Sequence, residues 1–494
     1  MNGAVENGYR KKLMVKNSHK LAMGLGDFGY SLISCTAATY IMTFGTMAVG
    51  VSGTLMGIAV AIGTFFDAIS DPIVGYISDN SRNRFFGKRH GFMLFGLILL
   101  VMTGVILWAV PLEMSMIGKF IWFAVGLTLI RTWNTLYFTP MSAFSVEVSD
   151  DYNERTTIQA IRSVFYILGM ILPVVAMGFF QNKYTVYDEA GNVLIGGQFS
   201  VQGYVDFSYV AGSIAIVTTV YLFVMTFSNV PRIRQRQMLD EIGERKKSSL
   251  KEVLLGFFNV LKNKDMRYII AGYSTAMVAA TLIITLGFHV FTFTFTLATT
   301  QMYFLMGGLL FMTIGGQPLW IYISKKTDKK RSMLIGLGLA LLGCIGLLIM
   351  FLARAGLNNF IRENRLGVAL MLPPLMIAGM GTGVLYSMPL ALIGDVVAKT
   401  KKTQKEEKTG TYAGMMTLAY KTSQALTQLV AGVALDLIGF QEGSHIQPQG
   451  VDASLGWFLC IGLILAISGG LLIFSRLKID KEEITKILEE QSNA

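Results

Sequence analysis

Charged residues are scarce in this chain. They make up 15% of its 494 residues, whereas a soluble protein of this length would carry about 25%. Cysteine is scarcer still, with Cys35, Cys344 and Cys460 as its three copies, each within an apolar segment. This placement excludes a disulfide framework and offers no metal-ligand spacing, so we expect the three thiols to pack as small side chains.

Other absences narrow the function classes further. Residues 1–20 are polar and basic and no small-residue cleavage site follows an apolar run, so we expect no cleavable signal peptide. No nucleophile or metal constellation indicates an enzyme. Basic residues cluster in 230–267 without interleaved aromatic side chains, so the formal charge of +11 does not indicate nucleic-acid binding.

Long apolar runs are what the chain has instead. Residues 92–110, 209–227 and 457–474 are each long enough to cross a hydrocarbon core of about 30 Å. Such runs recur throughout, and the pattern predicts an all-α polytopic membrane protein with twelve spans. The predicted spans are 21–48, 54–78, 91–110, 117–145, 156–179, 206–229, 268–290, 300–323, 333–353, 367–398, 410–437 and 456–475.

The Lys and Arg residues between the predicted spans are distributed unequally. The two tails and the alternate loops beginning with 79–90 hold 34 of them, and the opposite loops hold 5. The positive-inside rule therefore places both termini in the cytoplasm. We expect an integral protein of the plasma (inner) membrane, in contact with lipid.

An internal repeat divides the chain near its middle. Tyr76-Ile77-Ser78 ends the second predicted span and Tyr322-Ile323-Ser324 ends the eighth, and a basic loop follows each. Two six-helix halves in parallel orientation are the arrangement of major facilitator transporters. We therefore expect the major facilitator fold. Its parts are an N-terminal half (1–229), a cytoplasmic linker (230–267), a C-terminal half (268–476) and a cytoplasmic tail (477–494).

The second predicted span carries two carboxylates, Asp67 and Asp71, one helical turn apart on one face. In low dielectric they repel each other, so one would hold a proton or both would share a cation. Pro72 frees the carbonyl of Ala68, and Ser70 adds a hydroxyl. Hard oxygen ligands in a partly dry site suit a small cation; the alternative is a structural pair bonded to Arg on another helix.

Ionisable residues in other spans are also functional candidates. Arg162 and Lys421 could neutralise the Asp pair, bind an anionic or hydroxylated substrate, or form structural ion pairs. Arg131 fits either gating or substrate contact. Asp27 lies among glycines that allow close helix packing, and we expect it to face the cavity. His289 is expected at the membrane interface rather than in a proton relay.

The loop after the second span carries an acid beside several basic residues, Asp79, Arg82 and Arg84. An acid at a helix end next to Arg can form charge-assisted bridges to a neighbouring helix. Such a latch could break and re-form as two halves rock. The alternative is plain positive-inside charge.

The run from Asp67 to Asp79, followed by Arg82, Arg84, Gly87, Lys88 and Arg89, resembles the signature of the glycoside–pentoside–hexuronide:cation symporter family, to which the melibiose permeases belong. The similarity extends along the chain through Gly24–Gly29, Pro140, Glu147, Glu154-Arg155, Arg162, Asp395 and Tyr412–Lys421. The resemblance implies a sodium, lithium or proton site at Asp67, Ser70, Asp71 and Thr135. It also implies a substrate role for Arg162 and a coupling role for Lys421.

The remaining candidates follow from the same similarity. We expect the substrate to contact Asp27, Tyr30, Arg131, Arg162 and Lys421, and the cytoplasmic latch to comprise Asp79, Arg82, Arg84, Glu147 and Arg155. The chain departs from the melibiose permeases where they hold sugar. Ser31 and Phe138 stand in place of two Asp residues, and Ser142 replaces a Trp. The cation machinery is thus retained while the galactoside clamp is not.

The sequence therefore predicts a cation-coupled secondary symporter working by alternating access, with no cofactor other than the coupling cation Na⁺, Li⁺ or H⁺. Its substrate is expected to be a glycoside, pentoside, hexuronide or related polar solute. A lysolipid or another amphiphile is the alternative within transport. A non-transporting membrane scaffold or sensor is the alternative from another class, although it has no need of paired Asp residues.

Overall fold

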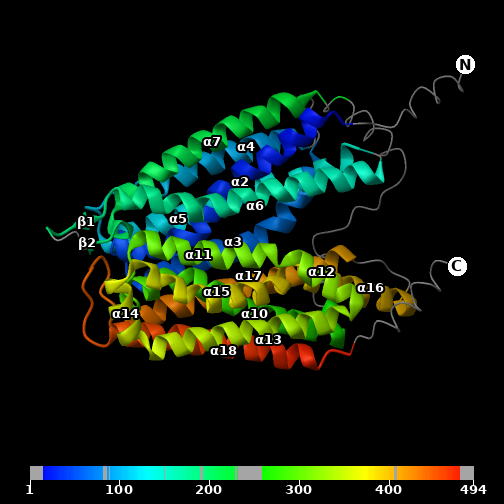
Figure 1. Cartoon of the computed structure of the whole chain (residues 1–494). Helices are drawn as coiled ribbons and strands as arrows, with labels where there is room; N and C mark the ends of the chain where they lie inside the picture. The colour runs from blue at the N-terminus through cyan, green and yellow to red at the C-terminus, as the bar shows by residue number, and fades with distance from the viewer. Residues whose placement is uncertain are drawn as a thin grey trace, which may run out of the picture. The chain divides into compact units, whose positions relative to one another are not determined.

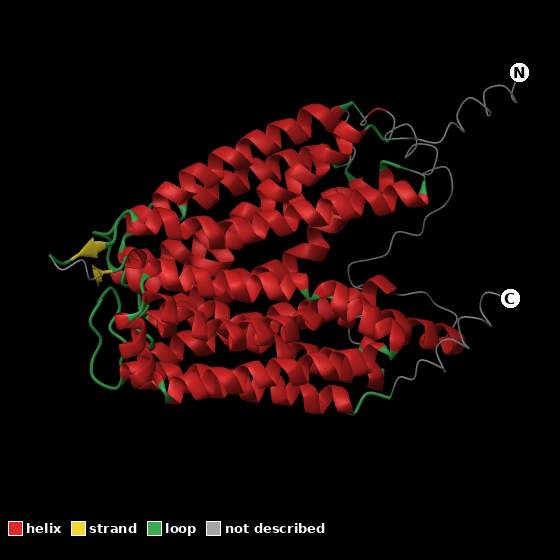
Figure 2. Cartoon of the chain, in the orientation of Figure 1, coloured by secondary structure: helices red, strands yellow, loops and turns green. Residues whose placement is uncertain are grey.

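The computed structural model describes residues 15–81, 86–87, 89–149, 151–189, 193–228, 231, 259–404 and 409–478. Helix dominates these residues, and a short two-stranded hairpin supplies the β structure that Figure 2 shows. Because a helix pairs all but its terminal backbone groups within its own segment, this is the architecture that a lipid environment requires.

Six long helices occupy the first part of the chain (Figure 1). They are α2 (Asn17–Thr43), α3 (Gly53–Asn80), α4 (His90–Ile106), α5 (Met116–Glu147), α6 (Tyr152–Asn182) and α7 (Val201–Phe227). A π-helical segment, η1 (Phe44–Ala48), continues α2. Strands β1 (Val186–Tyr187) and β2 (Val193–Ile195), which pair antiparallel, and the 3₁₀ turn η2 (Gly197–Phe199) connect α6 to α7.

The second part repeats this pattern with more interruptions. Its helices are α10 (Lys264–His289), α11 (Thr299–Gly315), α12 (Gln317–Lys326), α13 (Lys329–Leu352), α14 (Arg354–Glu363), α15 (Leu372–Gly383), α16 (Met388–Gln404), α17 (Thr409–Leu437) and α18 (Val451–Ser475). Three shorter segments complete it, the π-helical η3 (Val290–Thr294) and the 3₁₀ turns η4 (Arg365–Met371) and η5 (Val384–Tyr386).

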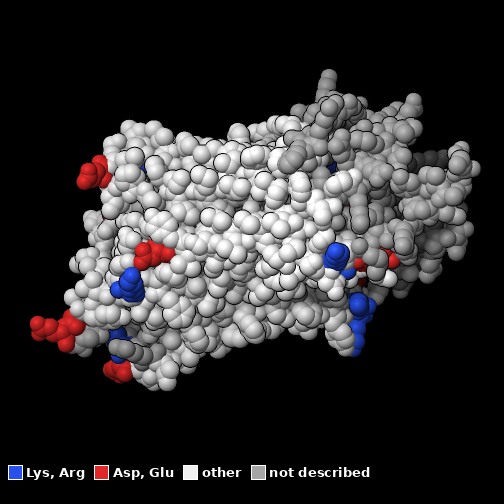
Figure 3. Space-filling model, turned by 90° about the horizontal axis from the view of Figure 1, so that it is seen from above, with Lys and Arg blue, Asp and Glu red and all other residues white. Residues whose placement is uncertain are grey.

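The surface agrees with a membrane protein. Within the described residues, nine helical segments are long and apolar enough to span a bilayer, and α4 is a shorter apolar helix. On the face seen in Figure 3, charged side chains lie toward two opposite ends and the band between them is uncharged. This distribution confirms the prediction of a polytopic helical membrane protein. All twelve predicted spans coincide with helices, although α2 and α17 are not among the apolar segments counted here.

The chain forms two compact units that do not follow the simple halves of the sequence. Unit 1 comprises Met1–Ile41, Phe66–Phe180 and Val201–Lys247, and unit 2 comprises Met42–Phe65, Gln181–Ser200 and Ser248–Ala494. Within unit 1, α4 packs against α5 and α7; within unit 2, α18 packs against α10 and α13 (Figure 1).

Small residues allow close helix contacts in both units. A Cβ on Gly29 of α2 would lie 2.3 Å from Oγ1 of Thr218 in α7, which is closer than atoms can approach. In unit 2, a Cβ on Gly432 of α17 would lie 2.1 Å from the carbonyl oxygen of Gly53, at the start of α3. The glycines of the first helix therefore pack as the sequence indicates.

The π-helical segments add to the sequence repeat. Segment η1 begins at Phe44 and η3 at Val290, the same offset (290 minus 44) that separates Tyr76 from Tyr322. Each continues the first long helix of its part of the chain, α2 or α10. An inserted π turn is often found at a functional position in a helix.

The structure also shows elements that the sequence analysis did not predict. The region between 353 and 367 was expected to be a loop, but it contains α14, whose polar composition gives no apolar run. The tenth predicted span, 367–398, is divided by η5 into α15 and α16. The eighth predicted span is interrupted at Gly316, because Pro318, in the first turn of the next helix, α12, has no amide hydrogen with which to continue α11.

Candidate functional site

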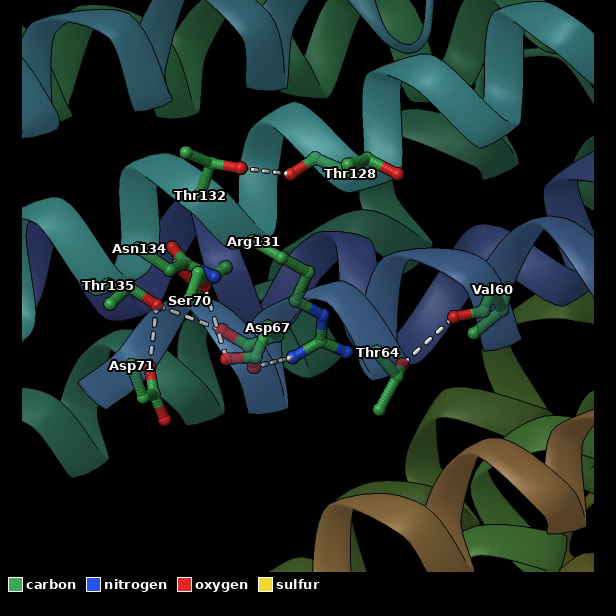
Figure 4. A network of polar contacts seen from close by, with 11 residues as sticks. Val60, Thr64, Asp67, Ser70, Asp71, Thr128, Arg131, Thr132, Asn134 and Thr135 are labelled. Atoms are coloured by element: carbon green, nitrogen blue, oxygen red, sulfur yellow. Dashed lines mark hydrogen bonds and ion pairs between the residues drawn. The ribbon is translucent and has the colours of Figure 1, made fainter. Parts of the chain in front are cut away.

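Two carboxylates and one hydroxyl meet between α3 and α5. Asp67 and Asp71 lie one turn apart on α3, and Thr135 of α5 faces both (Figure 4). The Thr135 hydroxyl lies 2.9 Å from Oδ1 of Asp67 and 2.7 Å from Oδ1 of Asp71. The two carboxylate oxygens can therefore be no further apart than the sum of these distances. Asp67 is 4% exposed and Thr135 is also 4% exposed, so water screens Asp67 poorly.

The hydroxyl cannot satisfy both acids. A Thr side chain has one proton to donate, and both contacts are within hydrogen-bond distance of its oxygen. Three oxygens thus gather around a single hydroxyl proton. Two ionised carboxylates at this separation repel each other, so a proton or a bound cation stabilises the arrangement. The residues fit the oxygen-ligand chemistry of a small cation.

Ser70 lies on α3 between Asp67 and Asp71. Its side chain is buried, and its hydroxyl donates to the main-chain carbonyl of Asp67 at 3.1 Å rather than to either carboxylate. The oxygen keeps its lone pairs while its proton is used. The neighbouring Asn134 of α5 accepts a bond from Ser34 of α2 at 2.6 Å, which ties α5 to α2 beside the site.

Arg131 approaches the acid pair from α5, one turn before Thr135. Its Nη1 lies 4.0 Å from Oδ2 of Asp67, and its side chain is 22% exposed (Figure 4). This distance allows Coulomb attraction but exceeds that of a hydrogen bond. Among the described contacts, Arg131 is therefore the positive group nearest Asp67. The sequence had left its role open between gating and substrate contact.

Asp27 and Arg162 form a buried ion pair. Nε of Arg162 donates to Oδ2 of Asp27 at 2.7 Å, and the hydroxyl of Tyr137 donates to Oδ1 at 3.0 Å. Nη1 of Arg162 donates to Ser145 at 2.7 Å and Gln159 at 3.1 Å. Both charged side chains are at least nine-tenths buried. Of the alternatives that the sequence left open for Arg162, the structure shows the ion pair.

Aromatic rings surround Tyr30 of α2. Its ring stacks on Phe138 with centroids 5.5 Å apart and lies 5.2 Å from Tyr137 and 6.2 Å from Tyr166. Phe138 is 42% exposed, so this cluster presents an apolar ring to its surroundings. Ser31 is fully buried and donates to the carbonyl of Phe28 at 3.1 Å, so its hydroxyl serves packing.

The predicted latch is described in part. Glu147, at the end of α5, binds Arg89 through contacts of 2.7 and 3.4 Å, and Arg89 also reaches the hydroxyl of Ser78 at 3.4 Å. Nε of Arg155 donates to the carbonyl of Ser149 at 2.7 Å. The side chains of Asp79, Arg82 and Arg84 lie outside the described residues, as does most of the 230–267 linker.

Lys421, a partly exposed residue of α17, belongs to unit 2. The same unit holds polar contacts that the sequence analysis missed. Asp436 of α17 caps the start of α3, accepting from the amides of Gly53 at 2.8 Å and Thr54 at 3.1 Å. His289 is completely buried within the protein, and its Nε2 lies 2.7 Å from the Thr46 hydroxyl. Neither partner could be identified without the tertiary packing.

Comparisons with known proteins identify the family of the chain. Residues 22–481 match a family described as MFS/sugar transport protein. An uncharacterised symporter from Synechocystis is 23% identical, with 91% of this chain and 93% of that protein aligned. The mouse sodium-dependent lysophosphatidylcholine symporter 1 is 21% identical, with 96% of this chain and 88% of that protein covered.

Solved structures show the same fold at low identity. A bacterial homologue of the lysosomal transporter Spinster, in an inward-facing and unoccupied conformation, gives a TM-score of 0.65 at 12% identity, covering 94% of this chain and 98% of that chain. A D-xylose-proton symporter gives 0.58 at 13% identity, covering 92% and 96%. The expected major facilitator fold is therefore confirmed.

Proposed function

We propose that this chain, which belongs to the family of MFS/sugar transport proteins, is a cation-coupled symporter of the plasma membrane. Asp67, Asp71, Thr135 and Ser70 supply the oxygens that hold Na⁺, Li⁺ or H⁺. The transported solute is a glycoside, pentoside, hexuronide or related polar organic molecule. The protein exposes its binding residues to one side of the membrane at a time.

One observation carries this proposal. The Thr135 hydroxyl lies within hydrogen-bond distance of both Asp67 and Asp71, and it has one proton for two acids. Two carboxylates held this close repel each other while both are ionised. An arrangement that gains stability from one added positive charge is suited to bind and release a cation in each cycle.

Coupling follows if the cation also changes the affinity for the solute. Asn134, next to Thr135, bonds to Ser34 of α2, and Tyr30 stands on the same helix one turn earlier. Movement of Thr135 toward a bound cation is therefore transmitted to residues that we expect to touch the solute. By thermodynamic reciprocity, the solute then raises the affinity for the cation by the same factor.

An amphiphile is the second candidate solute. Phe138 is 42% exposed and stacks on Tyr30, so the position that holds an acid in the melibiose permeases presents an apolar ring. The similarity to the sodium-dependent lysophosphatidylcholine symporter extends along 96% of this chain. A lysolipid or another molecule with an apolar portion would use this ring for packing.

A stability screen of purified protein tests the proposal. Sugars, uronates and lysolipids are added with and without Na⁺, Li⁺ or a change of pH, and the unfolding temperature is recorded. A ligand that binds the folded state stabilises it, so we expect one solute class to raise this temperature more with the coupling cation than without it. Wild-type protein that no cation stabilises, alone or with solute, would contradict the proposal.

A further inference from the structure

Arg131 is held loosely beside the proposed cation site. Its guanidinium has five N–H donors, and within the described residues its ionic contact is the one to Asp67, at 4.0 Å. No hydrogen bond of Arg131 accompanies it there. Its side chain is 22% exposed while that of Asp67 is 6% exposed, so the guanidinium remains partly hydrated when it turns away, and Asp67 then needs a bound cation to balance its charge.

Arg162, the other candidate on unit 1, is held much more firmly. It donates to Asp27 at 2.7 Å, to Ser145 at 2.7 Å and to Gln159 at 3.1 Å, and it is 5% exposed. Breaking a buried pair leaves an uncompensated charge, which costs about 3–5 kcal/mol. Of these two arginines, Arg131 is the one that can change partner at low cost.

We infer that Arg131 is a displaceable counter-charge that couples the cation to a negatively charged solute. With the cation site empty, the guanidinium partly neutralises Asp67. A cation bound by Asp67, Asp71 and Thr135 repels the guanidinium, which turns away and binds the carboxylate or phosphate of the solute. The inference rests on the proposed function and adds to it a coupling residue and an anionic substrate class.

The chemistry of the side chain supports both positions. A guanidinium binds carboxylate and phosphate groups through paired N–H donors, and at 4.0 Å from Asp67 it makes no such paired bonds to that acid. When no anion is present, Arg131 competes with the cation for Asp67 and lowers the affinity for the cation. When no cation is present, Asp67 competes with the anion for Arg131 and lowers the affinity for the anion. Each ligand therefore removes the competitor of the other.

Cation binding to purified protein tests the first half of the inference. Calorimetric titration with NaCl and LiCl, without solute, compares wild type with Arg131→Gln and Arg131→Lys. Removing the competing charge should tighten cation binding about tenfold in Arg131→Gln, while Arg131→Lys stays near wild type. Lys119→Gln, a charge removal about 18 Å earlier along the same helix, is the control and should change nothing. Equal affinity in Arg131→Gln and wild type would overturn the inference, provided both unfold at similar temperatures.

Paired solutes test the second half. Methyl β-glucoside is compared with its 6-carboxylate, and a monoacylglycerol with the corresponding lysophosphatidic acid, by thermal stabilisation with and without Na⁺. The wild type should favour the charged member of one pair at least tenfold, only with cation, and Arg131→Gln should lose that preference. The two pairs separate carboxylate from phosphate recognition. Equal binding of both members by the wild type, or a preference kept by Arg131→Gln, would overturn the anion role.

The two failures can be told apart. If wild-type protein binds no cation and shows no gradient-driven uptake, the proposed symport itself is wrong. If the wild type is cation-coupled while Arg131→Gln keeps wild-type cation affinity and solute preference, the symport stands and the inference about Arg131 is wrong.

Discussion

Replacing Asp71 by Asn removes a charge and keeps a ligand. The Oδ1 atom of Asp71 lies 2.7 Å from the Thr135 hydroxyl, and the amide oxygen of Asn can take the same place. The side chains are nearly the same size, so the fold should not change. The variant therefore isolates the electrostatic contribution of one carboxylate to cation binding.

The magnitude follows from Coulomb's law. A cation and a carboxylate about 4 Å apart attract by about 4 kcal/mol at an effective dielectric constant of about 20. Asp71 is partly exposed, so water screens it, and a loss of about 2–4 kcal/mol is expected. This corresponds to cation binding about 30- to 1,000-fold weaker. Asp67→Asn should weaken binding more, because it leaves the Arg131 charge beside the site without its acid.

Titration calorimetry of the purified variants with NaCl and LiCl at constant pH measures these affinities. Asp206→Asn is a matched control, because Asp206 belongs to the same unit but bonds Gln202 on its own helix at 2.8 Å. The control should bind cation as the wild type does. If both Asp67→Asn and Asp71→Asn bound cation within about threefold of the wild type, the pair would be structural and the reasoning refuted.

Three other predictions concern topology, substrate and stability. In intact cells a membrane-impermeant thiol reagent should label Gln441→Cys and not Ser248→Cys; the opposite pattern would contradict cytoplasmic termini. Because Ser31 is buried and Phe138 replaces an acid, calorimetry should show poor melibiose binding, and tight cation-dependent binding would refute this. Asp27→Asn should lower unfolding stability by about 3–5 kcal/mol, since Arg162 keeps its buried charge without the carboxylate that balances it; an unchanged denaturation midpoint would contradict a structural pair.

Much of the fold could be predicted because a membrane span is recognised by the length of its apolar run in the sequence. Each predicted span coincides with a helix, although its ends differ by a few residues. Interruptions were harder to predict. Helix α12 begins at Gln317, with Pro318 in its first turn, after a break, and η5 divides a segment that is mostly apolar. Helix α14 was missed because its many polar residues gave no span-length apolar signal.

The part of the candidate site that lies on a single helix could be predicted from the sequence. The four-residue spacing of Asp67 and Asp71 places them on one face regardless of the rest of the fold. Partners from other helices depend on helix rotation and tertiary packing, which spacing cannot supply. Thr135 was found through the family resemblance alone. The alternatives for Arg162 and Arg131 stayed open until the structure paired Arg162 with Asp27 and placed Arg131 at 4.0 Å from Asp67.

Departures from the family pattern were easier to see than to interpret. The resemblance marks Ser31 as the position of a lost acid, and the structure buries its side chain against α6, where Gly169 makes room for it, so Ser31 contributes packing. Phe138 was noted as a lost acid as well, and the structure gives it a new partner in Tyr30.

Gradient-driven uptake into proteoliposomes tests the central claim, cation-coupled symport through the Asp67–Asp71 pair. Protein is reconstituted with the solute identified by the stability screen, and inward gradients of Na⁺, Li⁺ and H⁺ are imposed one at a time. We expect the wild type to accumulate solute above the external concentration under one of these gradients. Asp71→Asn should lose accumulation while keeping part of its solute exchange. Uptake that only reaches equilibrium under every gradient, or full accumulation by both Asp67→Asn and Asp71→Asn, would contradict the account.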